Sequence, residues 1–134
     1  MSERNGYRGY IASRAVSGNT IPQRVQNMVV REFANAKGIE FKLSAVEYIM
    51  PECYMILEDV LNELPKLEGV IMYSLFMLPD DKKRRRVIFD HILDQGCVFH
   101  AALENLSIHT ANDISRIEDI LDVNAILPHT RKNG

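Results

Sequence analysis

Glu47, His100 and Glu104 are the side chains of this sequence whose types best suit acid/base chemistry. Carboxylates and an imidazole exchange protons with a substrate held beside them, for example when a proton is removed next to the carbonyl of a sugar. We predict that these three residues are catalytic. The alternative is that both carboxylates are solvated and that His100 is a hydrogen-bonded residue of the core.

A second set of polar residues is predicted to hold the substrate. Arg14 follows the first predicted strand, and a guanidinium binds a phosphate or carboxylate through two parallel hydrogen bonds. Ser13 has the hydroxyl of a nucleophile but no visible partner base, so we expect it to bind rather than attack. Three further residues are expected to orient hydroxyl groups of the substrate: Ser44, Tyr48 and Ser74.

Motifs for cofactors and metals are absent from the sequence. Cys53 and Cys97 match no Cys-x-x-Cys pattern, and the four histidines lack the spacing of metal ligands. Neither a P-loop nor a Gly-x-Gly-x-x-Gly segment occurs. We therefore predict no metal, no cofactor and two free thiols.

Composition limits the class of protein. A chain of 134 residues with 46% hydrophobic content is long enough for one core, so residues 1–134 are predicted to form a single domain. No apolar run approaches the roughly 18 residues of a membrane span, and the first residues do not resemble a signal peptide. The net charge of -2 disfavours nucleic acid as a partner. We expect a soluble, cytoplasmic protein without membrane contact.

One basic segment departs from this balance. Residues 80–86 read DDKKRRR, with the acidic residues first, as the start of a helix prefers. The segment predicts a solvated helix face. The alternative is contact with an anion or with another subunit.

Strand and helix patterns alternate along the chain, which is typical of a parallel sheet covered by helices. We predict an α/β fold with an open, mostly parallel sheet of four to five strands, helices on both faces, and a C-terminal helix. The core spans about residues 6–106, an amphipathic helix about 110–123, and a polar tail 128–134. The predicted strands are 9–13, 39–44, 67–78 and 97–103, with 104–108 as a short edge strand, and the other helices start at Thr20 and after Pro51 and Pro79.

Ligands of open α/β sheets bind beyond the carboxyl ends of the strands, where helix N-termini and loops converge. Most of the candidate residues above follow predicted strands. We therefore expect the functional site at this edge of the sheet.

Four segments of the sequence stand out in their order and spacing: GYRGYIASR, PQRVQN, SAVEYIMPECY and YSLFMLP. Over about residues 6–106, they resemble a small bacterial family, the sporadic carbohydrate cluster proteins. Members are named for gene neighbourhoods that build surface polysaccharides. The resemblance implies a role in surface-carbohydrate biosynthesis and leaves the reaction open.

Three segments, GYIAS, PQRVQ and GCVFHAALE, also resemble the catalytic domain of serine recombinases, the resolvases. The resemblance implies a resolvase-like, flavodoxin-like fold. A resolvase carries Arg-x-Ser at the first strand, where this sequence has Ala12, Ser13 and Arg14, and an Asp-Arg pair where it has Phe76 and Met77. Without those arginines, the charge that stabilises a transferring phosphate is missing, so recombinase activity is not expected.

These observations support two main hypotheses. In the first, an enzyme of bacterial surface-carbohydrate biosynthesis acts on a sugar phosphate or nucleotide sugar as an isomerase, epimerase or lyase. In the second, a non-catalytic module binds a carbohydrate-pathway enzyme through its final amphipathic helix or its basic helix. A degenerate recombinase-like protein that binds nucleic acid is a third alternative. By analogy with resolvase-like domains, which associate through helices, we also expect a homo-oligomer.

Overall fold

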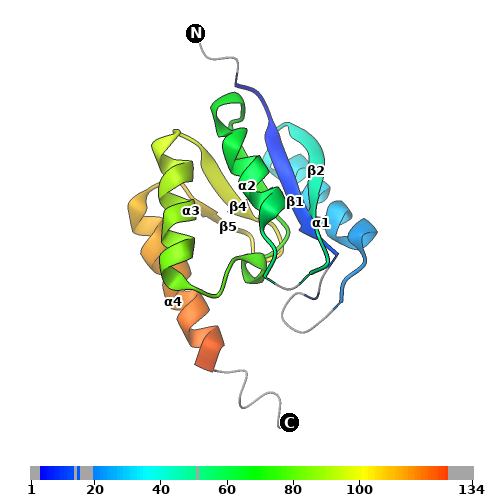
Figure 1. The fold of residues 1–134 in the computed structure, drawn as a ribbon. Helices are drawn as coiled ribbons and strands as arrows, with labels where there is room; N and C mark the ends of the chain where they lie inside the picture. Colours follow the sequence, from blue (N-terminus) through cyan, green and yellow to red (C-terminus); the bar gives the residue numbers. More distant parts are fainter. Residues whose placement is uncertain (1–3, 14, 16–19, 51, 127–134) are drawn as a thin grey trace.

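The computed structural model describes residues 4–13, 15, 20–50 and 52–126, without the side chains of 124–126. Strands, α-helices and two short 3-10 turns follow one another along the chain (Figure 1). The elements are β1 (Tyr7–Ala12), α1 (Gln23–Lys37), β2 (Phe41–Glu47), α2 (Met55–Asn62), η1 (Leu64–Lys66), β3 (Gly69–Met72), η2 (Leu75–Met77), α3 (Lys82–Asp94), β4 (Val98–Ala101), β5 (Leu106–Ile108) and α4 (Ala111–Ile126).

The five strands form one sheet in the order β2-β1-β3-β4-β5. The first four strands are parallel, and β5 pairs with β4 antiparallel. Helices α2 and α3 cover one face of the sheet, and α1 covers the other (Figure 1). This arrangement confirms the predicted α/β fold with helices on both faces and a C-terminal helix.

Strand β2 extends further than the sequence predicted. Its first part pairs Phe41 with Tyr7, and after a bulge opposite Gly9 it continues to Glu47, which pairs with Ala12. A Cβ at Gly9 would collide with the side chains of Ser44 and Phe41, so only glycine fits opposite the bulge. The sequence pattern predicts a loop over 45–52, but residues 45–47 belong to β2. Glu47 is the last residue of this strand.

Helix α1 has a different start from the one predicted. Thr20 and Gln23 have the spacing of a capping box, yet the N-cap is Pro22, whose extended backbone (ψ 142°) leads into the helix. The Gln23 side chain donates a hydrogen bond to Ser13 instead. The predicted end is confirmed, because Gly38 adopts the left-handed conformation (φ 69°) of a C-terminal cap.

The inward face of α1 is also shifted relative to the predicted apolar stripe. The helical spacing of Ile21, Val25, Met28, Val29 and Phe33 predicts that these residues face the sheet, but Val25 and Met28 are 43% and 63% exposed. The polar residue Gln26 is fully buried in their place. It shares this face with Val30, Phe33 and Ala34.

Strand β3 is shorter than the apolar run 67–78 that was predicted as one strand. Its pairing ends at Met72, and a 3-10 turn follows. Ser74 is the N-cap of this turn, because its Oγ accepts a hydrogen bond from the N–H of Phe76. The apolar side chains after the strand still enter the core, from the turn rather than from the sheet: Leu75, Met77 and Leu78.

A buried ion pair joins α3 to α4. Nη2 and Nε of Arg85 lie 2.6 and 2.9 Å from the carboxylate oxygens of Glu118, and Nη1 donates to the carbonyls of Pro79 and Asp80. The prediction that residues 80–86 form a solvated face is therefore wrong for Arg85. The helical spacing of Val87, Ile88, Ile92 and Leu93 predicts that they face the core, but Val87 is 68% exposed.

Helix α4 packs its predicted apolar stripe inside the protein. Ile114 and Ile117 are each 1% exposed, and the helix contacts α3 and β5. The spacing of Thr110 and Asp113 predicts a capping box. The carboxylate of Asp113 accepts hydrogen bonds from the N–H groups of His109 and Thr110, which is the carboxylate half of such a box. No helix in the described ranges is both long enough and apolar enough to cross a membrane.

We expect Glu118→Ala to lower the free energy of unfolding by about 3–5 kcal/mol, because Arg85 then remains buried without a partner. The double variant Arg85→Met/Glu118→Leu should recover most of this loss. Urea denaturation of each variant tests the prediction. The matched control is Asp90→Ala, which removes the exposed Arg86–Asp90 pair and should cost less than about 1 kcal/mol. Equal losses at both sites would contradict the prediction.

Candidate functional site

Ser13 lies directly after β1, at the carboxyl edge of the sheet. Its Oγ accepts a hydrogen bond from Nε2 of Gln23, the first residue of α1. The hydroxyl therefore lies beside the N-terminus of a helix. This placement agrees with the predicted position of Ser13, whereas Arg14 lies outside the described residues.

Gln26 fixes the backbone that carries Ser13. Its Oε1 accepts from the N–H of Ala12 at 3.0 Å, and its Nε2 donates to the carbonyl of Ala12 at 2.7 Å and to that of Ile21 at 2.8 Å. The amide thus satisfies both backbone groups of the last residue of β1. Sequence reasoning missed Gln26, although its spacing of four and seven residues from Val30 and Phe33 marks an inward position.

The N-terminus of α1 has an electrostatic character that suits an anion. Within the described residues, no side chain caps this terminus, and its first turn contains no acidic residue. Arg24, in that first turn, is exposed. Backbone N–H groups and the helix dipole at such a terminus attract negative charge.

Glu47 lies at the carboxyl end of β2 and is fully buried. Oε1 accepts from the hydroxyl of Tyr10 (2.7 Å) and the N–H of Leu57 (3.0 Å), and Oε2 from the N–H groups of Ile56 (3.1 Å) and Tyr48 (3.2 Å). Burial alone would raise the pKa of Glu47, but these hydrogen bonds lower it below its usual value. The carboxylate therefore stays ionised and holds the first turn of α2.

Glu104 follows β4 and holds the turn after β3. Its Oε2 accepts a hydrogen bond from Ser74 Oγ at 2.7 Å, and its Oε1 from the N–H of Leu75 at 2.9 Å. Burial raises the pKa of the neighbouring Tyr73, and the negative charge of Glu104 raises it further. Tyr73, which the sequence did not single out, therefore keeps its hydroxyl proton beside Glu104. Glu104 is partly exposed, and Ser74 is buried.

His100 lies on the face of the sheet that α1 covers. Its ring packs against Tyr7, the first residue of β1 (centroids 5.2 Å apart), and Phe33 in α1 (5.1 Å), and Nδ1 lies 2.6 Å from Ser107 Oγ. Burial, with the nearby charges of His109 and Lys37, lowers the pKa of His100 to about 4. These contacts lie toward the amino ends of the strands, so the structure does not bring His100 together with the two carboxylates.

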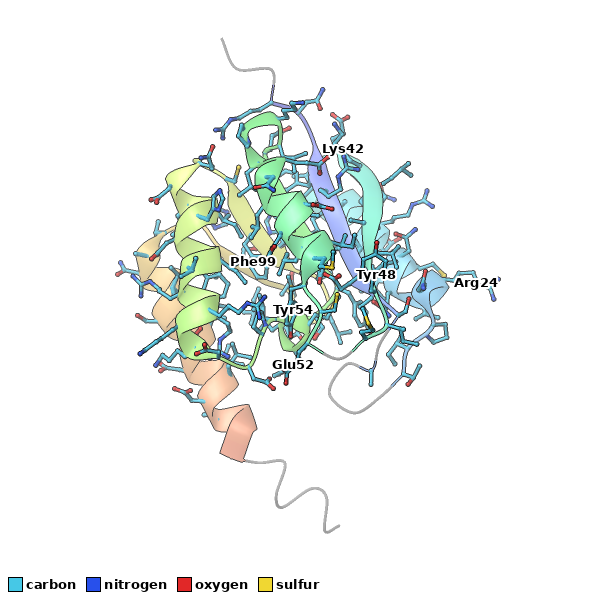
Figure 2. All side chains as sticks on the ribbon, viewed as in Figure 1. Arg24, Lys42, Tyr48, Glu52, Tyr54 and Phe99 are labelled. Atoms are coloured by element: carbon cyan, nitrogen blue, oxygen red, sulfur yellow. The ribbon has the colours of Figure 1, made fainter. Side chains whose placement is uncertain are left out.

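The remaining predicted residues divide between the edge and the interior of the sheet. Tyr48 follows Glu47 and is 50% exposed; Figure 2 shows it to the right of Tyr54 and Glu52. Ser44 does not end a strand as predicted. It lies within β2, and its hydroxyl donates to Asn27 of α1 at 2.6 Å.

The structure therefore gathers part of the predicted site. At the carboxyl edge lie Ser13, Glu47, Tyr48, Ser74 and Glu104, but Glu47 is enclosed by its own donors. Ser44 and His100 have structural partners elsewhere. Among the described residues, no three His, Cys, Asp or Glu side chains form a group that could hold a metal ion.

We expect Glu47→Gln to destabilise the fold by about 3 kcal/mol, because an amide supplies one acceptor where the carboxylate supplies two and directs a donor at backbone N–H groups. Chemical denaturation measures the loss. Glu52→Gln is the matched control, since Glu52 is exposed in the same loop; its effect should stay within about 0.5 kcal/mol. Similar effects in both variants would show that the buried contacts of Glu47 contribute little.

His100 should make stability depend on pH. Its pKa in the folded state, about 4, lies below its ordinary value of 6.5, so the folded protein binds fewer protons than the unfolded chain. The contribution of His100, about 3 kcal/mol, is present above pH 6.5 and is lost as the pH falls through 4.

Denaturation of the wild type and His100→Gln at several pH values across this window tests the prediction. The variant should lose less stability on acidification than the wild type. His91 in α3 is the control, and His91→Gln should keep the dependence. Parallel pH profiles for the wild type and His100→Gln would contradict the prediction.

Comparisons with known proteins identify the fold. Neither a family model nor a curated protein sequence matches the chain. A resolvase family site-specific recombinase from Streptococcus pneumoniae is similar in structure, with a TM-score of 0.64 and 10% identity over 94% of this chain and 93% of that one. The N-terminal catalytic domain of TP901-1 integrase has a TM-score of 0.57 and 17% identity, over 93% and 97%. The fold of this chain is resolvase-like.

Proposed function

We propose that this protein binds a phosphorylated sugar, as a sugar phosphate or nucleotide sugar, at the carboxyl edge of its sheet, in the biosynthesis of a bacterial surface carbohydrate. The observation that carries the proposal is the position of the Ser13 hydroxyl beside the N-terminus of α1. The pathway rests on the resemblance to the sporadic carbohydrate cluster proteins, for which no family model gives independent support.

The phosphate end of the ligand fits the N-terminus of α1. This 15-residue helix presents its N-terminus without an acidic side chain in the first turn, and Gln26 fixes the adjacent strand end. A phosphate there accepts hydrogen bonds from backbone N–H groups and from Ser13. Arg14, which follows Ser13 in the sequence, supplies the positive charge in this proposal.

The sugar end of the ligand lies toward Tyr48 and Glu104 in this proposal. A half-exposed tyrosine ring stacks on a sugar ring or binds its hydroxyl groups. Of the three predicted acid/base residues, Glu104 combines a place at the edge with partial exposure. Proton exchange by Glu104 suits an isomerisation, epimerisation or elimination.

The two other hypotheses have weaker support. The stripe of α4 that was offered as a docking surface is buried against the core, and of the cations in α3, Arg85 pairs with Glu118 and Arg84 lies over the ring of Tyr54. Both similar structures are named as a recombinase or an integrase. The chain has Phe76 and Met77, however, where the resolvase pattern has an Asp-Arg pair, so strand exchange is not proposed.

The test is a binding panel on the full chain: inorganic phosphate, hexose phosphates and nucleotide sugars, measured by thermal shift and calorimetry. At least one sugar compound should bind more tightly than phosphate alone. Ser13→Ala should weaken that binding by roughly tenfold, which is the loss of one hydrogen bond to a charged group. Ser115→Ala, at an exposed serine of α4, is the matched control and should bind normally.

Turnover of the bound compound is then followed with Glu104→Gln, which should bind the ligand but lose turnover. Absence of binding by every sugar compound, or unchanged affinity in Ser13→Ala, would overturn the proposal. Retention of duplex DNA that falls steeply with salt would favour the recombinase-like alternative instead.

A further inference from the structure

Strand β2 is an open edge of the sheet. It pairs with β1 on one side, and within the described residues no strand pairs with its other side. It is seven residues long, from Phe41 to Glu47. Proteins usually protect such edges with short strands, outward charges, prolines or covering segments, because unpaired N–H and C=O groups recruit another strand.

Large apolar side chains are exposed along this edge and the loop that continues it. We call six of them the β2 rim, and they make up more than half of the large exposed hydrophobic side chains in the described residues. The rim consists of Leu43 (80% exposed), Val46 (38%), Tyr48 (50%), Ile49 (67%), Met50 (55%) and Met55 (60%).

The strand part of the β2 rim carries no exposed charge. Residues 43–50 read LSAVEYIM, and their one charged residue, Glu47, is fully buried among its donors. Charged residues flank this stretch: Lys42 is half-buried before it, and Glu52 is exposed after it. Two copies can therefore bring residues 43–50 together without repulsion between like charges. The usual electrostatic protection of an edge strand is missing at this part of β2.

The exposed area of the rim matches what a dimer requires. Large side chains expose roughly 200 Å² when fully accessible, so six with exposed fractions from 38% to 80% leave about 600 Å² on each copy. Two copies would bury about 1,200 Å², the lower bound for a stable, specific interface. Backbone hydrogen bonds between the strands add to this apolar contact.

The segments of this sequence that lie outside the described ranges are mostly polar. Residues 14 and 16–19 contain one large apolar side chain, and residues 127–134 read LPHTRKNG, in which polar residues predominate. A second copy, by contrast, presents an apolar edge of equal length. An interface of this kind is self-complementary about a two-fold axis.

We propose that two copies of this chain associate through antiparallel pairing of their β2 strands, with the β2 rims packed against each other. The two five-stranded sheets then form one continuous sheet. This dimer uses a strand edge, and not the helix-mediated association expected by analogy from the sequence. The dimer does not depend on the proposed ligand site. The two proposals share Tyr48, which packs in the dimer interface here, so in a dimer the contact with the sugar falls to Glu104 alone.

The experiment compares two double variants with the wild type by sedimentation equilibrium and light scattering. Leu43→Lys/Ile49→Lys places charges on the rim at residues that are 80% and 67% exposed, so the monomer should fold normally. Val87→Lys/Val123→Lys makes the same chemical change on α3 and α4, at residues that are 68% and 56% exposed. Circular dichroism and thermal melting check the fold of each.

The wild type and the helix variant should be dimers at roughly micromolar concentrations, and the rim variant should have a dissociation constant raised by about a hundredfold or more. A monomeric wild type would overturn the proposal, as would a rim variant that remains a dimer. Dissociation of the helix variant alone would assign association to α3 and α4 and would equally overturn it.

Discussion

The carboxylate of Glu47 is the contact on which the carboxyl edge of this sheet depends. It accepts hydrogen bonds from the hydroxyl of Tyr10 in β1 and from two N–H groups in the first turn of α2. One buried charge at the end of β2 therefore connects two strands to a helix. A carboxylate in this position is stable because the helix N-terminus and the phenol together replace water. The β2–α2 loop, including Tyr48, takes its position from this contact.

The fold was predictable from the alternation of strand and helix patterns, and Gly38 marked the end of α1 correctly because a left-handed cap leaves a local signature. Three of the errors share one physical cause. Glu47, Gln26 and Arg85 are polar or charged residues in inward positions, and each has a partner 10 or more residues away in the sequence. The pattern of apolar and polar residues predicts that such side chains face solvent. It cannot show the hydrogen-bond partner that stabilises each of them in the interior, because that partner lies in another element.

The candidate site was predictable to a smaller degree. The rule that ligands bind at the carboxyl ends of parallel strands placed Ser13, Ser74 and Glu104 at one edge, and the hydrogen bonds of the structure agree with that placement. The rule does not predict which face of the sheet a side chain lies on. His100 lies on the face that α1 covers, where its ring packs against Tyr7 and Phe33. This chain shares a fold with a recombinase to which it is 10% identical, and the fold determines where the loops meet. The function depends on the side chains in those loops, which the fold does not determine.

The two edges of the sheet differ in a way that limits how the protein can polymerise. Strand β5 has three residues, runs antiparallel to its neighbour and is packed against α4, so it offers almost no length for another strand. A filament grows by joining unlike surfaces, and it needs two usable edges on every subunit. With β2 as the sole long edge in the described part of the chain, strand addition ends after one event. The asymmetry of the sheet thus protects against fibre formation without requiring charged residues on β2.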